Sequence, residues 1–273
     1  MTLVVAWLGV DQRGPCSAYI ASDSRISWGN EASFDYARKV FACNNYPDIF
    51  GYCGEVLFPS IVMSQIVEMA DCGLLFREEF SCEQKFYVVL EKLNSVFEKY
   101  PHEVKNITSD VLQIVHLSRE NNGKEFSCYL IEWRRSLGWE YKVIDLPKNS
   151  DTLALMGTGS IEFDQNYKRY NKGLNVGTSR NVFHCFCDTL FNIADKTCGG
   201  APQLVGLFRK PRSHAVKFGV LSNGKRYLFG AEVDDLNNFD NIQWRNDLFE
   251  LCDGVTMKRK EGAIPQPDIL KRY

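Results

Sequence analysis

The chain has 273 residues, of which 45% are hydrophobic and 13% aromatic, enough to bury a sizeable core as one large domain spanning 1–273. Lysine and arginine number 32 against 34 for aspartate and glutamate, so the net charge of -2 gives no general attraction to nucleic acid or to an anionic membrane. No apolar run approaches the roughly 18 residues of a membrane helix, and no basic segment leads into a signal-peptide core. A cytoplasmic protein is therefore expected.

The ten cysteines are dispersed through apolar segments, which indicates reduced and mostly buried thiols, not a disulfide scaffold. No CxxC pair occurs. The closest cluster is His184, Cys185 and Cys187, but residues two apart on a helix point to nearly opposite faces. No metal site and no organic cofactor are expected.

The first part of the chain predicts strands followed by helices. Residues 2–10 (TLVVAWLGV) and 17–27 (SAYIASDSRIS) predict a hairpin over the turn-forming DQRGPC, and 39–45 and 47–55 predict two more strands. From Pro59 the period becomes helical. Two stripes of residues at helical spacing predict two helices. The first is Ile61, Gln65, Ile66 and Met69, and the second is Phe86, Val89, Leu90, Leu93 and Phe97.

The second part of the chain returns to strands at 111–118, 126–133, 139–146 and 152–159. A helix follows, expected to end at the glycine pair of KTCGGAPQ. Its stripe is Phe183, Phe186, Leu190 and Ile193. Strands are then predicted at 202–210, 215–222 and 226–233, the last two as a hairpin over SNGK, and the polar residues 254–273 predict an extended C-terminal tail.

The order of elements is strands, two helices, strands, two helices and strands. We expect an α+β fold in which two antiparallel sheets pack together and the helices cover their outer faces. This is a four-layer αββα sandwich.

The start of the chain carries the first chemical signal. An initiator methionine is normally removed when the next side chain is small, so the mature chain would begin at Thr2 and carry a hydroxyl and a free amine on one residue. A threonine there could also be an ordinary strand residue. Asp23 and Lys39, each in a predicted strand, favour the catalytic interpretation of Thr2. A Lys paired with a partly buried Asp keeps its charge, and this charge favours the neutral form of a nearby α-amine. That amine could act as a base.

Six segments in order resemble the proteasome family of N-terminal-nucleophile hydrolases, which includes proteasome β subunits, HslV and Anbu. The segments cover roughly residues 1 to 207, and their ordered set is more specific than any one of them. They are TLVVAW, SDSRISWG, ARKVF, GYCGE, MGTGS and DKTCGGAPQLV.

The resemblance implies catalytic roles. Thr2 matches the nucleophile, whose α-amine relays the proton, and Lys39 and Asp23 match the family's lysine and its acidic partner. A purely structural salt bridge is the alternative for that pair. Gly54 matches the glycine whose N–H stabilises the oxyanion, although Glu55 replaces the usual second glycine, and an ordinary loop glycine is the alternative.

A second group matches the residues that hold the α-amine and the hydroxyl. Thr158 stands at the family's serine and Asp195 at its aspartate. Cys198 stands where serine is common, and a thiol is a weaker donor and acceptor than a hydroxyl. A spare nucleophile at Cys198 is less expected than a packed thiol.

The resemblance also implies where a substrate lies. The backbone of Ser27 matches the position that pairs with an extended substrate strand. The side chains matching the specificity pocket are uncharged, which predicts cleavage after hydrophobic or aromatic residues. They are Ile26, Ala37, Phe41, Tyr52 and Val56.

The resulting hypothesis is a threonine peptidase that forms an acyl-enzyme on Thr2 after removal of Met1. The resemblance implies a homo-oligomeric ring or stack, with an activator or ATPase as a further partner. Two alternatives stay open: a catalytically silent scaffold subunit that retains Met1, and an amidohydrolase that acts on a small amide.

Overall fold

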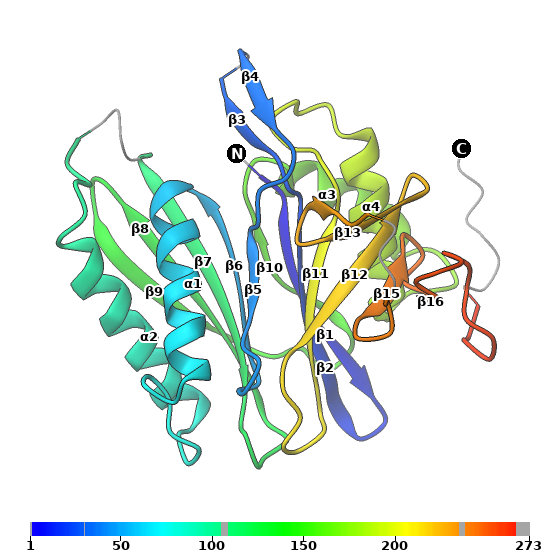
Figure 1. The fold of residues 1–273 in the computed structure, drawn as a ribbon, viewed down its shortest axis with the longest axis horizontal. Coiled ribbons are helices and arrows are strands. Elements are labelled where there is room, and N and C mark those ends of the chain that lie inside the picture. Colours follow the sequence, from blue (N-terminus) through cyan, green and yellow to red (C-terminus); the bar gives the residue numbers. More distant parts are fainter. Residues whose placement is uncertain (1, 30, 105–108, 235–237, 266–273) are drawn as a thin grey trace.

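The computed structural model describes residues 2–29, 31–104, 109–234 and 238–265. Strands, two helices, strands, two helices and further strands follow one another, as predicted (Figure 1). The helices are α1 (Leu57–Asp71), α2 (Cys82–Phe97), α3 (Ser160–Tyr170) and α4 (Ser179–Asn192). The sequence pattern had not located α3.

A five-stranded antiparallel sheet lies beside α1 and α2. Its order is β5 (Val40–Ala42), β6 (Asp48–Gly54), β7 (Val111–Arg119), β8 (Phe126–Arg134) and β9 (Gly138–Ile144). A capping box in which Ser81 and Gln84 exchange hydrogen bonds starts α2. The helical stripe of α2, including Phe86, Val89 and Leu93, is buried in an aromatic-rich cluster against this sheet.

A larger sheet lies beside α3 and α4. Its main path is β10 (Asp151–Met156), β1 (Val4–Asp11), β2 (Gly14–Ser22), β11 (Gln203–Phe208), β12 (Val216–Ser222), β13 (Lys225–Leu228) and β14 (Ala231–Glu232). Two short strands extend it, β15 (Gln243–Asn246) and β16 (Leu251–Cys252). The hairpins predicted over DQRGPC and SNGK are β1–β2 and β12–β13.

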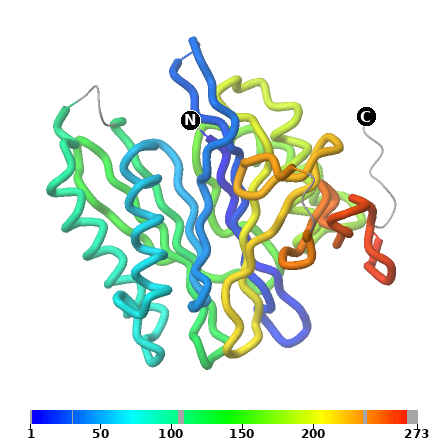
Figure 2. The backbone as a smooth tube through the Cα atoms, in the orientation of Figure 1, coloured from blue at the N-terminus to red at the C-terminus, as the bar shows by residue number. Residues whose placement is uncertain are grey.

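The apolar run at the start of the chain is explained by burial on both faces of β1. Leu3, Val5 and Trp7 pack toward α3 and α4, whereas Val4, Ala6 and Leu8 pack between the two sheets. A strand that is buried on both sides needs no polar alternation. In Figures 1 and 2, α1 and α2 lie beside the smaller sheet, and α3 and α4 lie beside the larger one.

The two predicted sheets are not wholly antiparallel. β15 pairs in parallel with β12, from Phe218 opposite Gln243 to Leu221 opposite Asn246. Residues 223–242 separate these strands, which is long enough for the chain to return and run in the same direction. A separate two-stranded hairpin, β3 (Ile26–Trp28) and β4 (Ala32–Phe34), projects at the end of the molecule where the N-terminus lies (Figure 2).

Two predicted segment ends are also wrong. Helix α4 ends at Asn192, well before the glycine pair, because Ile193 takes an extended conformation. The N–H of Gly199 donates to Asp23 instead. Residues 254–265 do not run out as an extended tail. They turn back, Arg259 bridges to Cys252, and Arg180 at the start of α4 donates to the carbonyls of 264 and 265. The rest of the predicted tail, 266–273, lies outside the described residues.

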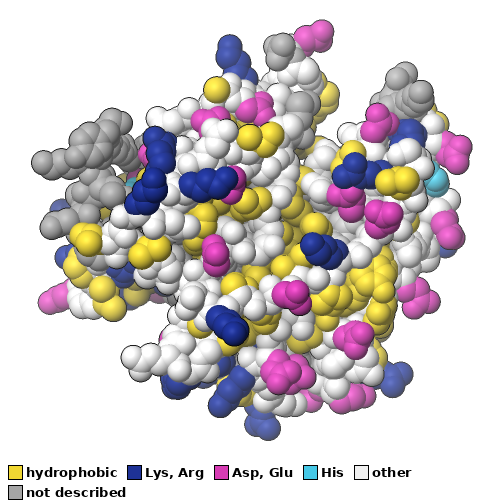
Figure 3. All heavy atoms as spheres, turned by 180° about the vertical axis from the view of Figure 1, so that it is seen from behind, with side chains coloured by type: hydrophobic (Ala, Val, Ile, Leu, Met, Phe, Trp, Pro, Cys, Tyr) yellow, Lys and Arg dark blue, Asp and Glu magenta, His cyan; other side chains and the backbone are white. Residues whose placement is uncertain are grey.

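Charges on the face opposite to that of Figure 1 are mixed. Figure 3 shows hydrophobic side chains across the middle of this face, with lysine, arginine and acidic side chains scattered among them and no broad patch of one sign. In the described part of the chain, none of the helices is both long enough and apolar enough to span a bilayer.

A charged cluster is fully buried under α2. The Lys85 ammonium donates to Asp48 at 2.6 Å and to the carbonyl of Arg119 at 2.8 Å, and His116 Nε2 lies 2.9 Å from the other Asp48 oxygen. Burial lowers the pKa of His116, although the hydrogen bond and charge of Asp48 oppose this. His116 Nδ1 has no hydrogen-bond partner among the described residues. The imidazole is therefore held in its neutral form.

This lowered pKa predicts a loss of stability in mild acid. The unfolded chain takes up a proton at His116 below pH about 6.5, whereas the folded chain resists protonation, so the free energy of unfolding falls as pH drops through that value. We therefore expect the free energy of unfolding, measured by urea unfolding, to fall between about pH 7.5 and about pH 5.5. His116→Gln should abolish this part of the fall. The exposed His214→Gln should keep it, and equal pH dependence in both variants would contradict the assignment.

Candidate active site

Thr2, Asp23 and Lys39 meet at one end of the two sheets. Thr2 precedes β1, Asp23 follows β2, and Val4 lies opposite Ser22 in the pairing of these strands. Leu3 and Asp23 are linked twice, from Asp23 N to Leu3 O at 3.1 Å and from Leu3 N to Asp23 Oδ1 at 3.2 Å. Lys39 enters from the other sheet, immediately before β5. The pairing of β1 with β2 therefore places Thr2 next to Asp23, and the packing of the two sheets brings Lys39 to them.

The Lys39 ammonium is held by three oxygens. It donates to Thr2 Oγ1 at 2.7 Å, to Asp23 Oδ1 at 2.9 Å and to the carbonyl of Arg25 at 2.5 Å. An ammonium has three N–H bonds, so each finds an acceptor. Thr2, Asp23 and Lys39 are 2%, 0% and 1% exposed, which makes the contact a desolvated one.

The Asp23 carboxylate accepts hydrogen bonds on both oxygens. Oδ1 accepts from Lys39 and Leu3 N, and Oδ2 accepts from Arg25 N at 3.2 Å and Gly199 N at 3.1 Å. These four donors fix the orientation of the carboxylate and therefore the position of the Lys39 ammonium.

Gln203, which the sequence analysis missed, links the backbone at Asp23 to the backbone at Ala37 and Lys39. Its amide nitrogen donates to the carbonyls of Asp23 at 2.9 Å and Ala37 at 2.8 Å, and its oxygen accepts from Lys39 N at 3.1 Å. The side chain is fully buried at the start of β11. A lone amide at the head of an otherwise apolar strand, QLVGLF, was the available signal.

Thr158, Asp195 and Cys198 form a second cluster. Thr158 Oγ1 donates to Asp195 Oδ2, and Cys198 Sγ lies 3.6 Å from the same oxygen. Burial and the charges of Asp23 and Asp195 raise the pKa of Cys198 to about 12, so it stays a neutral thiol near neutral pH. Burial alone would raise the pKa of Asp195, but hydrogen bonds from Thr158 and Thr197 lower it overall. Asp195 is therefore an anionic acceptor.

The loop after β10 joins this cluster to Thr2. Gly159 N donates to the Thr2 carbonyl at 3.2 Å. Gly157 has φ +84, and a Cβ there would lie 2.0 Å from the Thr2 carbonyl oxygen. Only glycine allows both this backbone conformation and this close approach. The GTG segment therefore positions the backbone of residue 2.

Gly54 and Glu55 lie at the end of β6. Glu55 N donates to Val111 O at 2.9 Å, and because bonded positions alternate in an antiparallel pair, Gly54 N–H points away from β7. It points to the side on which Tyr52 N donates to Lys39 O at 3.2 Å. The Glu55 carboxylate accepts from Leu57 N at the start of α1 and from Ser109 N. It serves as a helix cap there.

The residues predicted to bind substrate fall into two groups. Ile26, Ser27 and Val56 are half-buried, and Ser27 pairs with Ser33 in the β3–β4 hairpin. Phe41 and Tyr52 are 2% and 1% exposed and belong to the cluster under α1 and α2, and Ala37 is also buried. Three of the six side chains are therefore buried and the other three are partly exposed.

The Arg38 side chain, which the sequence analysis missed, contacts one of these residues, Phe41. The Arg38 guanidinium sits 4.4 Å from the centre of the Phe41 ring and 4.2 Å from that of Phe229. Burial lowers the pKa of Arg38 to about 10, so it keeps its charge at neutral pH. One of the residues predicted to line the specificity pocket therefore lies in contact with a cation.

Arg25 and Asp35 frame a cavity next to the second cluster. Their side chains form a two-pronged ion pair, with Arg25 Nε 2.6 Å from Asp35 Oδ1 and Nη2 2.8 Å from Oδ2. The cavity of about 450 Å³ is lined by this pair together with Cys198, Gly199 and Lys196. In the described ranges of the chain, no three His, Cys, Asp or Glu side chains are grouped to hold a metal ion.

Comparison with known proteins bears on the fold. No family model matches the chain, and no curated protein matches its sequence. A Gly-1 mutant of Anbu from Hyphomicrobium sp. strain MC1 aligns with a TM-score of 0.51 at 12% identity, covering 80% of this chain and 86% of that one. Anbu from Yersinia bercovieri aligns with a TM-score of 0.51 at 8% identity, covering 77% and 85%. This chain has the fold of Anbu.

HslV from Trypanosoma brucei also aligns, with a TM-score of 0.47 at 10% identity over 75% of this chain and 99% of that one. The resemblance stated from the six sequence segments is thus confirmed for the fold by the two Anbu structures. Identities near 10% carry no residue roles, so the chemistry at Thr2 has to be argued from this chain's own geometry.

The close approach at Gly157 predicts a large and specific effect of substitution. Gly177 also has a positive φ, +70, but a Cβ there would meet nothing within 4 Å. Gly177→Ala should therefore lower the free energy of unfolding by about 1 kcal/mol, from backbone strain alone. Gly157→Ala should lower it by about 3 kcal/mol or more, because the methyl group also displaces the Thr2 carbonyl. Urea unfolding measures both, and equal losses would show that Gly157 does not position Thr2.

Proposed function

We propose that this chain is a threonine hydrolase of peptide bonds that acts from Thr2 once Met1 is removed. Met1 itself lies outside the described residues. The single observation that carries the proposal is the 2.7 Å hydrogen bond from a fully buried Lys39 ammonium to Thr2 Oγ1. A structural salt bridge needs only Asp23 and Lys39, and does not require a hydroxyl as the third partner.

In the first step Thr2 Oγ1 attacks the carbonyl carbon of a peptide bond. The hydroxyl proton passes to the α-amine of Thr2, whose ordinary pKa of about 7.7 to 8 suits a base near neutral pH. Lys39 stabilises the developing negative charge on Oγ1. The C–N bond then breaks as the leaving nitrogen takes the proton from the α-ammonium, and an ester on Thr2 remains.

In the second step water hydrolyses this ester. The same α-amine takes a proton from the water as it attacks, and the proton passes to Oγ1 when the Thr2–acyl bond breaks. The tetrahedral oxyanion in both steps is assigned to Gly54 N–H, which points away from β7 toward the side of Lys39.

Thr158, Asp195 and Cys198 are assigned to holding the new α-amine. Thr158 and Cys198 both contact Asp195 Oδ2, and the same loop as Thr158 holds the Thr2 carbonyl through Gly159 N. An anionic Asp195 close to the terminus favours an ammonium when the amine has taken up a proton. The neutral Cys198 thiol packs against Asp195 in this cluster and does not act as a second nucleophile.

Further parts of the proposal concern substrate and assembly. Ser27 pairs with an extended peptide, and the side chain before the cleaved bond is apolar, next to Ile26 and Val56. We also assign the four-layer αββα arrangement, which three buried clusters support: one under α1 and α2, one between the sheets and one under α3 and α4. A cytoplasmic homo-oligomer that encloses its sites completes the proposal.

The nucleophile is tested by substitution at Thr2. Thr2→Ala should remove hydrolysis of fluorogenic peptides, a loss of about 10³-fold or more, whereas Thr2→Ser should retain activity because it keeps both the hydroxyl and the amine. Intact-mass analysis of protein from its own host should show that Met1 is absent. Turnover that survives Thr2→Ala would refute the nucleophile.

Two other outcomes would favour the alternatives. Retention of Met1 together with absent turnover would indicate a scaffold subunit. Turnover of small acyl-amides alone, still lost in Thr2→Ala, would indicate an amidohydrolase with the same chemistry and another substrate.

The role of Lys39 is tested with a matched pair of variants. Lys39→Met leaves the buried Asp23 without its cation, so the free energy of unfolding should fall by about 3 kcal/mol or more. Turnover of the remaining folded protein should fall by about 10²-fold or more, because Oγ1 loses its stabilising charge. Lys196→Met, at an exposed lysine in the nearby cavity, should change neither quantity. Unchanged turnover in folded Lys39→Met would remove Lys39 from the mechanism.

A further inference from the structure

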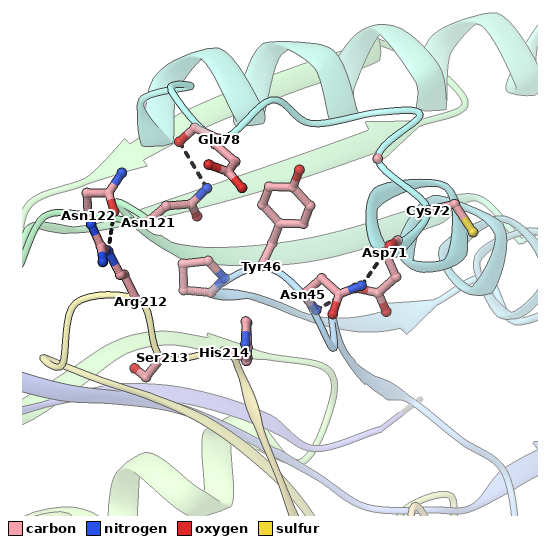
Figure 4. A pocket seen from close by; sticks show the side chains of 12 residues that line it. Asn45, Tyr46, Asp71, Cys72, Glu78, Asn121, Asn122, Arg212, Ser213 and His214 are labelled. Atoms are coloured by element: carbon pink, nitrogen blue, oxygen red, sulfur yellow. Dashed lines mark hydrogen bonds between the residues drawn. The ribbon is translucent and has the colours of Figure 1, made fainter.

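A second cavity lies at the opposite end of the sheets from Thr2, where four loops meet (Figures 1 and 4). We call it the loop pocket; it has a volume of about 670 Å³. The loops connect β5 to β6, α1 to α2, β7 to β8 and β11 to β12. This volume lies within the range of about 300–1,000 Å³ that is typical of small-ligand sites.

Hydrogen bonds join two of these loops, β5–β6 and α1–α2, along one side of the loop pocket. Asn45 N donates to the carboxylate of Asp71, at the end of α1, at 2.8 Å. The Tyr46 hydroxyl donates to Phe76 O at 3.0 Å. Figure 4 shows the Tyr46 ring in the middle of the pocket wall.

Further hydrogen bonds close the ring of loops on the other side. The Asn121 amide donates to Glu78 O at 3.1 Å, and Arg212 N donates to Asn121 O at 2.8 Å. Ala215 N donates to Tyr46 O at 3.4 Å, which returns to the starting loop. The loop pocket is thus a built site, not a gap between independent loops.

A buried guanidinium supports this ring from behind. Arg119 is fully buried and donates to the carbonyls of Glu120 and Gly123, and through Nη2 to the carbonyl of Ser213 at 2.6 Å. It therefore fixes the loop after β7 to the loop after β11, the two loops that carry Asn122 and Arg212.

Charged groups of opposite sign line the loop pocket without pairing. Neither the Glu78 carboxylate nor the Arg212 guanidinium forms an ion pair with any residue that the structure describes, and Arg212 makes only a 3.4 Å side-chain contact, to Asn122. Figure 4 shows the Glu78 carboxylate beside the Tyr46 ring, on the side of the pocket. His214 lies on the wall near Arg212 (Figure 4).

We propose that the loop pocket binds a short peptide in its zwitterionic form, with the peptide ammonium at Glu78 and its carboxylate at Arg212 and His214. Asn122 can donate to and accept from the peptide backbone, and the Tyr46 ring offers an apolar surface. The proposal uses no part of the Thr2 site and does not depend on its chemistry.

Other ligand classes satisfy these walls less well. A purely anionic ligand such as phosphate pairs with Arg212 but is repelled by the carboxylates of Glu78 and Asp71. A purely cationic ligand would be repelled by the charge of Arg212. An apolar ligand would cover both charges without replacing their hydrogen bonds to water, which is costly.

Calorimetric titration with the tripeptide Ala-Tyr-Ala tests the proposal on the full chain. We expect binding, and N-acetylation or C-terminal amidation should each weaken it about tenfold or more, because a charged hydrogen bond is lost. Inorganic phosphate serves as the anionic probe. Absence of tripeptide binding at about 10 mM, or phosphate binding without tripeptide binding, would overturn the proposal.

Substitutions then locate the binding. Glu78→Gln should remove the effect of N-acetylation, and Arg212→Gln should remove the effect of amidation. Both side chains are exposed, so both variants should keep the melting temperature of the parent chain. The neighbouring exposed residues give matched controls, Glu79→Gln and Lys210→Gln, which should bind like the parent. Binding at the Thr2 end would be insensitive to all four substitutions, and that result would overturn the proposal.

Discussion

The buried ammonium of Lys39 is the constraint on which the functional end of this molecule depends. A cation taken out of water requires an acceptor for each of its N–H bonds, and Lys39 finds them in a hydroxyl, a carboxylate and a backbone carbonyl. All three acceptors belong to segments that continue from the larger sheet, whereas Lys39 leads into the smaller one. The contact therefore links the sheets, and Gln203 repeats this link through the backbone on both sides. Chemistry and the relative position of the two sheets rest on the same few hydrogen bonds.

The two ends of the packed sheets are built differently. At the Thr2 end, charges are paired and desolvated, and the short loops carry glycines where the backbone approaches closely, as at Gly157. At the other end, loops are tied by hydrogen bonds through their backbones, while the side chains of Glu78 and Arg212 keep their charges open to the loop pocket. A rigid rim with unpaired charges suits binding, and a buried pair around a hydroxyl suits a reaction.

The sequence carried much of the architecture and the principal site, for identifiable reasons. Apolar runs and helical stripes located most strands and three of the four helices, and the ordered motifs brought Thr2, Asp23 and Lys39 together before any geometry was known. Gln203 and Arg38 were missed because their roles depend on which strands become neighbours, which no local pattern encodes. The parallel β15 was missed for the same reason. The glycine pair at 199–200 was taken as a helix end, but α4 ends at Asn192 and Gly199 N–H donates to Asp23. The roles of the catalytic and substrate-binding residues stay proposals.

The two-sided burial of β1 has a consequence for how the N-terminal segment can vary. Odd and even residues of this strand fill different hydrophobic layers, with Trp7 on one side and Ala6 and Leu8 on the other. Inserting or deleting one residue would exchange the layers and force an indole into space shaped for small aliphatic groups. The distance along the chain from Trp7 back to residue 2 is therefore set by the shape of the hydrophobic interior. Evolution can exchange side chains of equal volume in this strand far more readily than it can change the strand's length.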